Sequence, residues 1–375
     1  ERSASLYVAY REVISRLDVD TAATVDDDGR LHVAALKAVP DPPSLIDLRR
    51  RVEAMVPRVD LPELVLEVMS WHPGFTEAFT HISGNPARVG DLGLSVAAVL
   101  CASAMNVGFS PVVSPGAEAL TRDRLHHVDQ HYVRLDTLAA ANSVLVEAQA
   151  LIGLARLWGG GLVASVDGMR FVVPVRTIHA RPNPKYFGRK RGITWMNMIN
   201  DQAAGLADKV VSGTPRDSLH AVDVVLRQHG GTMPEVIITD TGSYSDIVFG
   251  LLHLLGRQYR PQLANLPDQR LWRVDRGADY GPLDKAARGV IDPERIARHW
   301  EDMCRVAVSI HTGEVSAHEV TRMISRDGRP TALGEAIAHF GRIFKTMHVL
   351  RLVDDEPYRR QIKAQTNLTE GRHDL

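Results

Sequence analysis

Two aspartates follow short apolar runs that the sequence predicts to be β-strands. Residues 162–165 form the run ahead of Asp167, and Val236-Ile237-Ile238 forms the run ahead of Asp240. Carboxylates at the carboxyl ends of strands in an α/β sheet face the crevice where ligands usually bind. Two such groups, joined by a third carboxylate, can hold Mg²⁺, which prefers carboxylates, water and phosphate oxygens. Two ions about 4 Å apart would stabilise both the attacking and the leaving oxygen of a phosphoryl displacement.

Each aspartate also has a plainer interpretation. Asp167-Gly168 is a common turn pair, and an aspartate after a strand often caps the following helix. Asp240-Thr241-Gly242 also resembles the catalytic segment of an aspartic protease, but such an enzyme needs two carboxylates that share a proton. The chain contains one Asp-Thr-Gly. The residues that follow it are spaced for a helix rather than a strand, which argues against a protease.

A histidine cluster, formed by His126, His127 and His131, raises the question of a zinc site. His127 and His131 are four residues apart, which places both on one face of a helix. The segment lacks the glutamate of an H-E-x-x-H motif, and no third ligand is evident nearby in the sequence. A polar helix surface is therefore the favoured interpretation, with zinc as the alternative.

The segment after Asp167 carries a local excess of positive charge. Residues 168–200 contain no Asp or Glu, and Tyr186, Phe187 and Trp195 are interleaved with basic side chains. A cationic, aromatic-bearing segment beside an acidic site suits contact with nucleic-acid phosphates, although a solvated loop can have the same composition. The predicted nucleic-acid contacts are Arg170, Arg176, Arg181, Lys185, Tyr186, Arg189, Lys190 and Arg191.

Hydrophobic periodicity separates the chain into regions that would position these residues. Residues 1–157 are predicted to be mostly helical, with one hairpin at 24–33. Residues 158–270 contain short apolar strands, with a turn expected between two of them at Asp167-Gly168, followed by strand–helix alternation. Residues 271–365 are predicted to be helical again. The expected fold class is α/β, with a mixed sheet flanked by large all-α parts.

The bulk composition limits the function classes. The chain has 375 residues, with Lys+Arg 44 and Asp+Glu 45, so any nucleic-acid contact must come from local patches rather than from net charge. Cys101 and Cys304 form no C-x-x-C pair, and two lone thiols fit a reducing cytosol. No apolar run of about 18 residues exists, so no membrane span is expected. The first residue is Glu1, and we expect the chain to be a piece of a longer protein.

Several long motifs, in one order, resemble those of the transposases of the gamma-delta (Tn-three) superfamily, which move transposons replicatively. The similarity runs through nearly the whole chain. The matching segments are W-H-P-G-F-T-E-A-F-T-H at 71–81, A-M-N-V-G at 104–108, S-V-D-G-M-R-F at 165–171, N-P-K-Y-F-G at 183–188, T-D-T-G at 239–242 and V-F-G-L-L-H-L-L-G at 248–256.

The resemblance implies an RNase H-like catalytic core with a D-D-E triad. Asp167 corresponds to the first Asp and Asp240 to the second. Glu370, in N-L-T-E-G-R at 367–372, corresponds to the Glu, although Leu-Thr replaces the Lys-Gly of many members. Asp374 is a competing acid one helical turn further on. Residues 271–365 would then be a helical insertion, and residues 366–375 would begin the helix that carries the third carboxylate.

The resemblance also implies the reaction and its partners. The expected activity is metal-dependent cleavage at transposon ends and strand transfer into target DNA, with two Mg²⁺ ions for which Mn²⁺ could substitute. The partners would be the terminal inverted repeats and the target DNA, with a homodimer in the full-length protein and a location in the bacterial cytoplasm at the nucleoid. The alternative is a truncated, inactive remnant that only binds DNA or a partner.

Overall fold

The structure is a computed structural model, and it describes residues 2–17, 23–84, 89–212, 218–242, 244–325 and 330–373. The chain forms two compact units, each with its own internal contacts. Unit 1 comprises Glu1–Leu36, Gly153–Gln228 and Thr232–Leu375, and unit 2 comprises Lys37–Ile152 and His229–Gly231. Among the described residues, no helix is both long enough and apolar enough to cross a lipid bilayer.

Unit 2 is helical in the part that the structure describes. Its core forms around α5, whose small apolar residues Val96 and Val99 pack against Leu125 and Val128 of α6 and against Phe79. The run of Ala, Val and Leu in α5 therefore has the buried position that its composition predicts. The helices are α2 (Pro43–Met55), α3 (Leu61–Trp71), α4 (Pro73–Glu77), α5 (Leu92–Ala104), α6 (Arg122–His131) and α7 (Leu135–Leu151), with a 3-10 turn η1 (Glu118–Leu120).

Unit 1 contains a six-stranded mixed sheet. Its strands lie in the order β6-β5-β3-β7-β8, with β4 also paired to β5. β3 pairs antiparallel with β5 and parallel with β7, so the strand pairing changes from antiparallel to parallel at β3. The sheet strands are β3 (Val163–Val172), β4 (Arg181–Pro182), β5 (Arg191–Asn200), β6 (Gly205–Ser212), β7 (Val236–Thr239) and β8 (Gln258–Tyr259). The predicted mixed α/β class is confirmed.

Helices cover both faces of this sheet. Ser165 of β3 contacts α16 through Gln365, whereas Lys209 of β6 contacts α10 through Asp223. Ser165 is paired with Ile199 and Lys209 with Met196, and alternate side chains of a strand point to opposite faces. α10 and α16 therefore lie on different faces. The helices near the sheet are α8 (Gly153–Trp158), α9 (Pro184–Phe187), α10 (Ser218–Leu226), α11 (Asp246–Leu254) and α16 (Glu356–His373).

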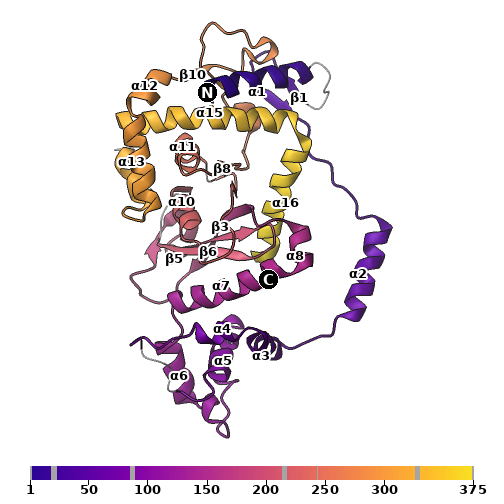
Figure 1. Cartoon of the computed structure of the whole chain (residues 1–375), viewed down its shortest axis with the longest axis vertical. Helices are drawn as coiled ribbons and strands as arrows, with labels where there is room; N and C mark the ends of the chain where they lie inside the picture. The colour runs from indigo at the N-terminus through magenta and orange to yellow at the C-terminus, as the bar shows by residue number, and fades with distance from the viewer. Residues whose placement is uncertain are drawn as a thin grey trace. The chain divides into compact units, whose positions relative to one another are not determined.

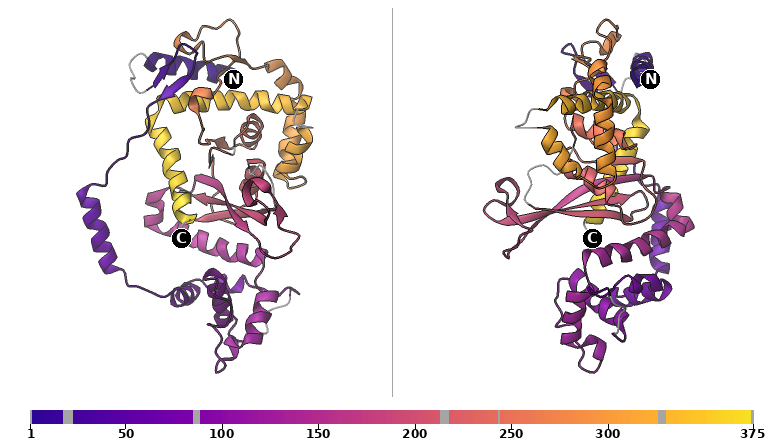
Figure 2. Two further views of the ribbon diagram at one scale, coloured as in Figure 1. Left: turned by 180° about the vertical axis from the view of Figure 1, so that it is seen from behind. Right: turned by 60° about the vertical axis from the view of Figure 1, so that its left-hand side comes forward.

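The long helix α15 organises the rest of unit 1. It runs beside α1 and α11, and α16 leaves its end and descends to the sheet (Figures 1 and 2). Gly250 of α11 and Gly341 of α15 face each other so closely that a Cβ on either would meet the backbone of the other helix. The remaining elements are α1 (Arg2–Leu17), β1 (Ala23–Val25), β2 (Leu31–Val33), η2 (Leu266–Asp268), β9 (Trp272–Arg273), η3 (Gly281–Leu283), β10 (Gly289–Val290), α12 (Pro293–Arg298), α13 (Trp300–His311), α14 (Ala317–Ile324) and α15 (Ala332–Asp354).

One local prediction is wrong. The expected turn at Asp167-Gly168 does not exist, because β3 continues without a break from Val163 to Val172. β5 holds it extended, with pairs that run from Ala164↔Asn200 to Val172↔Gly192. A long antiparallel partner satisfies the backbone groups of this segment and so overrides the turn preference of Asp-Gly.

The compact units also differ from the regions predicted from periodicity. The hairpin predicted at 24–33 is confirmed as β1 and β2, but it lies in unit 1 rather than with the following helices. Lys285 explains part of this grouping, because its Nζ donates a 3.0 Å hydrogen bond to the carbonyl oxygen of Asp27 in the hairpin turn. The boundary predicted at residue 365 falls inside α16, which is continuous.

Candidate active site

Asp167 and Asp240 lie at the point where two parallel strands separate. The β3–β7 ladder ends with the pair Val166↔Thr239, and each aspartate is the next residue along its own strand direction. Beyond this pair β3 continues with β5 alone, while the chain after β7 turns towards α11. The structure thus brings the two predicted aspartates together at the carboxyl end of the parallel ladder, where α/β sheets open to ligands.

The carboxylate of Asp167 is half-buried and has a perturbed pKa. Desolvation raises this pKa, and the negative charge of Asp240 raises it further. The backbone N–H of Gly168, which donates a 2.7 Å hydrogen bond to Oδ1, opposes the shift, as do the nearby charges of His373 and Arg170. A burial penalty and a like charge together create a site that a cation would stabilise.

Asp240 is exposed, but it directly follows β7, whose last residue is buried and hydrogen-bonded. The preceding Thr239 is buried, and its Oγ1 lies 2.8 Å from the hydroxyl of the buried Tyr259 on β8. The Asp240 Oδ1 atom accepts a 3.2 Å hydrogen bond from the N–H of Gly242. One carboxylate oxygen therefore shapes the local turn, while the other accepts no hydrogen bond from the part of the chain that the structure describes.

Helix α16 is anchored on the face of the sheet that carries Asp167. The Gln365 amide donates 3.0 Å hydrogen bonds both to Ser165 Oγ and to the carbonyl oxygen of Ile199. One turn later, Thr369 contacts Ser165 through their hydroxyls. Another turn along the same face is His373, whose Nδ1 lies 3.5 Å from Asp167 Oδ2.

His373 was not among the residues predicted from the sequence. Its Nε2 atom lies 2.9 Å from the Asn197 side-chain amide, and Asn197 is the cross-strand partner of Asp167. The imidazole therefore spans β3 and β5 beside the carboxylate. Its spacing in Glu370-x-x-His373 was the available signal, because residues three apart on a helix are neighbours.

Glu370 lies on α16 three residues before His373 and is exposed. It is adjacent along the helix to the residue that contacts Asp167, but the described residues contain no group of three or more acidic, His or Cys side chains arranged to hold a metal ion. The structure therefore brings Asp167 and Asp240 together without placing Glu370 against them. Asp374, the competing acid, lies outside the described residues.

The basic segment after Asp167 projects from the same strands. All seven of its basic side chains are exposed. The Arg170 guanidinium lies 4.0 Å from the centroid of the Tyr186 ring, and Lys185 Nζ lies 4.9 Å from it, so the aromatic ring holds two cations together. Asn183 caps α9 by accepting a 3.1 Å hydrogen bond from the N–H of Lys185. This cap and the β4–β5 pairing give the segment a defined shape.

The histidine cluster in unit 2 gains a member that the sequence did not reveal. His127 and His131 lie one turn apart on α6, with ring centroids separated by 4.7 Å. The ring of His81 lies 5.4 Å from that of His131. The described residues nevertheless contain no arrangement of these rings that could hold a metal ion.

Comparison with known proteins finds one matching family and several similar transposases. The Tn3 transposase DDE domain family matches residues 63–375. The transposase for transposon Tn4556 of Streptomyces fradiae is 62% identical over 374 residues, which are 100% of this chain and 42% of that protein. The transposase for transposon gamma-delta of Escherichia coli (strain K12) is 44% identical, over 97% of this chain and 36% of that protein.

The transposase for transposon Tn1546 of Enterococcus faecium is 33% identical over 93% of this chain. The chain thus spans less than half the length of these relatives. The family match includes β3, which carries Asp167, β7, which ends one residue before Asp240, and α16, which carries Glu370. This chain belongs to the family of the Tn3 transposase DDE domain.

Proposed function

We propose that this chain is the catalytic region of a DNA transposase, which cleaves DNA at transposon ends and joins the freed ends to target DNA. The observation that carries the proposal is the adjacency of Asp167 and Asp240 at the end of the β3–β7 parallel ladder. The relatives named above, all transposases of bacterial transposons, support the same reaction. The substrate would be transposon-end and target DNA in the bacterial cytoplasm.

We further propose that the sheet is an RNase H-like core. The strand order β6-β5-β3-β7-β8 supports this, with three antiparallel strands followed by two parallel ones. Numbered along the chain within the core, this is the order 3-2-1-4-5. The first and fourth core strands are then central neighbours, and they are the two strands that lead to Asp167 and Asp240.

The donor set at this position fits a divalent cation such as Mg²⁺. Two carboxylates lie close enough for the charge of Asp240 to raise the pKa of Asp167, so each would gain from a shared positive ion. Mg²⁺ or Mn²⁺ bound by these oxygens would activate water and stabilise the charge that develops on a transferring phosphoryl group. We assign Asp167 and Asp240 as the ligands.

Glu370 would supply a third carboxylate from α16. Two observations support this role: it is exposed, and it precedes by one helical turn the histidine that contacts Asp167. The anchoring of Gln365 and Thr369 on Ser165 fixes the height of α16 over the sheet. Rotation of the Glu370 side chain, or a small shift of the last helical turn, would then bring its carboxylate towards the aspartates.

The exposed basic segment would hold the DNA backbone beside these acids. Arg176, Arg181, Lys185, Arg189, Lys190 and Arg191 form no ion pair with an acidic residue in the described ranges. Their charges are thus available for phosphates. Such contacts position a duplex without reading its sequence. Tyr186 would keep the guanidinium of Arg170 oriented through their stacking.

The test is Mg²⁺-dependent nicking of a supercoiled plasmid that carries a transposon end, by the full-length protein. Asp167→Asn and Asp240→Asn should abolish nicking and strand transfer while they leave DNA binding in a gel-shift assay within about twofold. Glu370→Gln should have the same effect if it is the third ligand. Glu314→Gln, which changes another exposed glutamate, is the matched control and should behave as wild type. Full cleavage by Asp167→Asn would contradict the proposal.

A further inference from the structure

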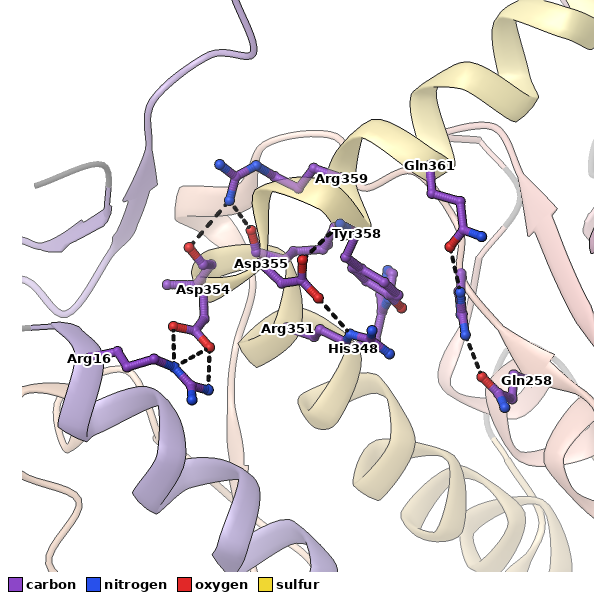
Figure 3. Close-up of polar contacts among 12 residues, drawn as sticks. Arg16, Gln258, His348, Arg351, Asp354, Asp355, Tyr358, Arg359 and Gln361 are labelled. Carbon is purple, nitrogen blue, oxygen red and sulfur yellow. Dashed lines mark hydrogen bonds and ion pairs between the residues drawn. The ribbon is translucent and has the colours of Figure 1, made fainter. Parts of the chain in front are cut away.

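A cavity with several charged side chains in its lining lies in unit 1 apart from the aspartates, bounded by α1, the segment around β8, α15 and the start of α16. Its volume is about 680 Å³, within the usual range for small-molecule sites. None of its lining residues is Asp167, Asp240, Glu370 or a member of the basic segment after Asp167. Figure 3 shows part of its wall, where Arg16, Arg351, Asp354, Asp355 and Tyr358 gather at the junction of α15 and α16.

The charges that line this cavity do not balance. Two arginines are already paired: Arg16 Nε lies 2.8 Å from Asp354 Oδ2, and Arg351 Nε lies 3.1 Å from Asp355 Oδ2. Three further arginines line the cavity, Arg2, Arg257 and Arg260, against one further carboxylate, that of Glu12. Among the described lining residues the paired charges cancel and a surplus of two positive charges remains.

Arg257 and Arg260 form no ion pair with an acidic side chain in the part of the chain that the structure describes. The Arg257 Nε atom is buried and has no hydrogen-bond partner among the described residues. Arg260 donates hydrogen bonds of 2.9 Å to Gln361 Oε1 and 2.6 Å to Gln258 Oε1, both of which are neutral amides. Burial disfavours the charged form of Arg260 and lowers its pKa. An uncompensated cation and an unused donor are costly inside a protein, and an anion in the cavity would offset both costs.

Aromatic rings complete the lining beside these arginines. The Tyr358 ring is 5.0 Å from the Arg260 guanidinium and 4.3 Å from that of Arg351. The Phe344 ring is stacked on His253, with centroids 3.7 Å apart and an interplanar angle of 16°. Tyr358 and Phe344 thus form an apolar part of the lining against which a base can lie, while guanidinium groups bind phosphate through paired N–H donors.

We propose that this cavity binds a nucleotide, with its phosphate on Arg257 and Arg260 and its base against the aromatic side chains. The phosphate would complete the hydrogen bonding of Arg257 and neutralise Arg260. The cavity is also connected to the proposed catalytic strands. Tyr259, which lies between the two arginines in the sequence, forms a hydrogen bond through its hydroxyl with Thr239 of β7. The nucleotide can come from solution or from a DNA strand, and both sources offer the same phosphate and base.

Titration calorimetry of the full-length protein with deoxyadenosine monophosphate tests the site. Arg257→Gln/Arg260→Gln should weaken this binding by about tenfold or more, because each change removes a charge-assisted contact. Arg257→Lys/Arg260→Lys keeps the charge but not the paired donors, and should weaken binding by an intermediate amount. The matched control is Arg288→Gln/Arg298→Gln, which alters two exposed arginines away from the cavity and should bind as wild type.

Two further arms identify the source and separate this proposal from the catalytic one. A labelled 12-nucleotide single strand that deoxyadenosine monophosphate displaces would identify DNA as the source, and binding of the mononucleotide without displacement would identify the free nucleotide. Asp167→Asn should bind the mononucleotide normally, so failure of one proposal leaves the other standing. Binding of inorganic phosphate as tightly as the mononucleotide, or no effect of Arg257→Gln/Arg260→Gln, would overturn the assignment.

Discussion

The Nδ1 atom of His373 lies 3.5 Å from Oδ2 of Asp167, and its Nε2 atom lies 2.9 Å from the amide of Asn197. The imidazole of α16 therefore contacts both β3 and β5 and lies against the proposed metal ligand. A side chain that contacts a ligating carboxylate in this way fixes its orientation, and its loss commonly weakens metal binding.

We therefore expect His373→Gln to lower Mg²⁺-dependent nicking by about 10- to 100-fold, the usual range for residues that orient a metal ligand. The effect should be largest at low Mg²⁺ and should shrink as Mg²⁺ is raised, because the ligand is misplaced rather than removed. A titration of nicking rate against Mg²⁺ measures this. His311→Gln, a change at an exposed histidine on α13, is the control. A His373 variant with unchanged Mg²⁺ dependence would remove the positioning role.

The basic segment should govern how DNA binding responds to salt. Arg189→Ala/Arg191→Ala should reduce the slope of log K against log salt by about 0.9 for each DNA phosphate that the variant no longer neutralises. Fluorescence anisotropy of a labelled duplex between low and moderate salt gives that slope. Arg288→Ala/Arg298→Ala removes the same charge from exposed positions elsewhere. An equal change in slope for both double variants would show that only net charge matters.

The crossing of α11 and α15 should tolerate no side chain at Gly341. A Cβ there would collide with the backbone of Asp246 and Gly250. Gly341→Ala should lower the free energy of unfolding by about 1–3 kcal/mol, the usual cost of overpacking. Gly371→Ala, in α16 with open space around its Cα, should leave stability unchanged or raise it by about 0.5–1 kcal/mol. Urea unfolding of both variants compares them directly.

Acid should destabilise unit 1 through a buried histidine. His348 is buried; its Nδ1 lies 2.7 Å from the Tyr358 hydroxyl and its Nε2 lies 2.9 Å from the carbonyl oxygen of Pro261. Desolvation lowers the pKa of His348 from 6.5 to about 3. As pH falls below 6.5, His348 is therefore protonated in the unfolded chain but stays neutral in the folded chain. The stability that this residue contributes is complete above pH 6.5 and is lost as pH falls towards 3.

Between pH 7.5 and pH 5, His348 alone should cost about 2 kcal/mol of unfolding free energy. His348→Gln should be less stable at neutral pH but should lose less stability on acidification, as measured by urea unfolding at the two pH values. His179→Gln, at an exposed position, is expected to follow the wild-type pH dependence. A His348 variant with the full wild-type acid sensitivity would contradict this prediction.

Local sequence patterns were a sound guide to the secondary-structure elements. The apolar run Val236-Ile237-Ile238 predicted a buried strand, and the helical spacing after Ser245 predicted α11. Both predictions are confirmed, because burial of a continuous apolar run and of one helical face dominates local preference. The exposed basic segment was likewise visible, since charge composition is a property of the sequence itself.

Long-range pairing could not be predicted in the same way. Asp167-Gly168 has the composition of a turn, yet β5, about 30 residues later, holds it in an extended strand. His373 contacts Asp167 across more than 200 residues of sequence. Both contacts depend on which segments fold against each other, and the spacing of Glu370 and His373 indicates only that the two residues are neighbours on a helix.

The sequence alone therefore determined which residue types were available: two aspartates that follow apolar runs, a segment with only basic charge, and the helices around them. The tertiary structure decided that β3 and β7 lie side by side, that α16 lies over Ser165, and that His373 rather than Glu370 contacts Asp167. The physical reason is that strand register and helix docking are set by burial and hydrogen bonding between distant segments. Spacing along the chain contains no measure of those contacts.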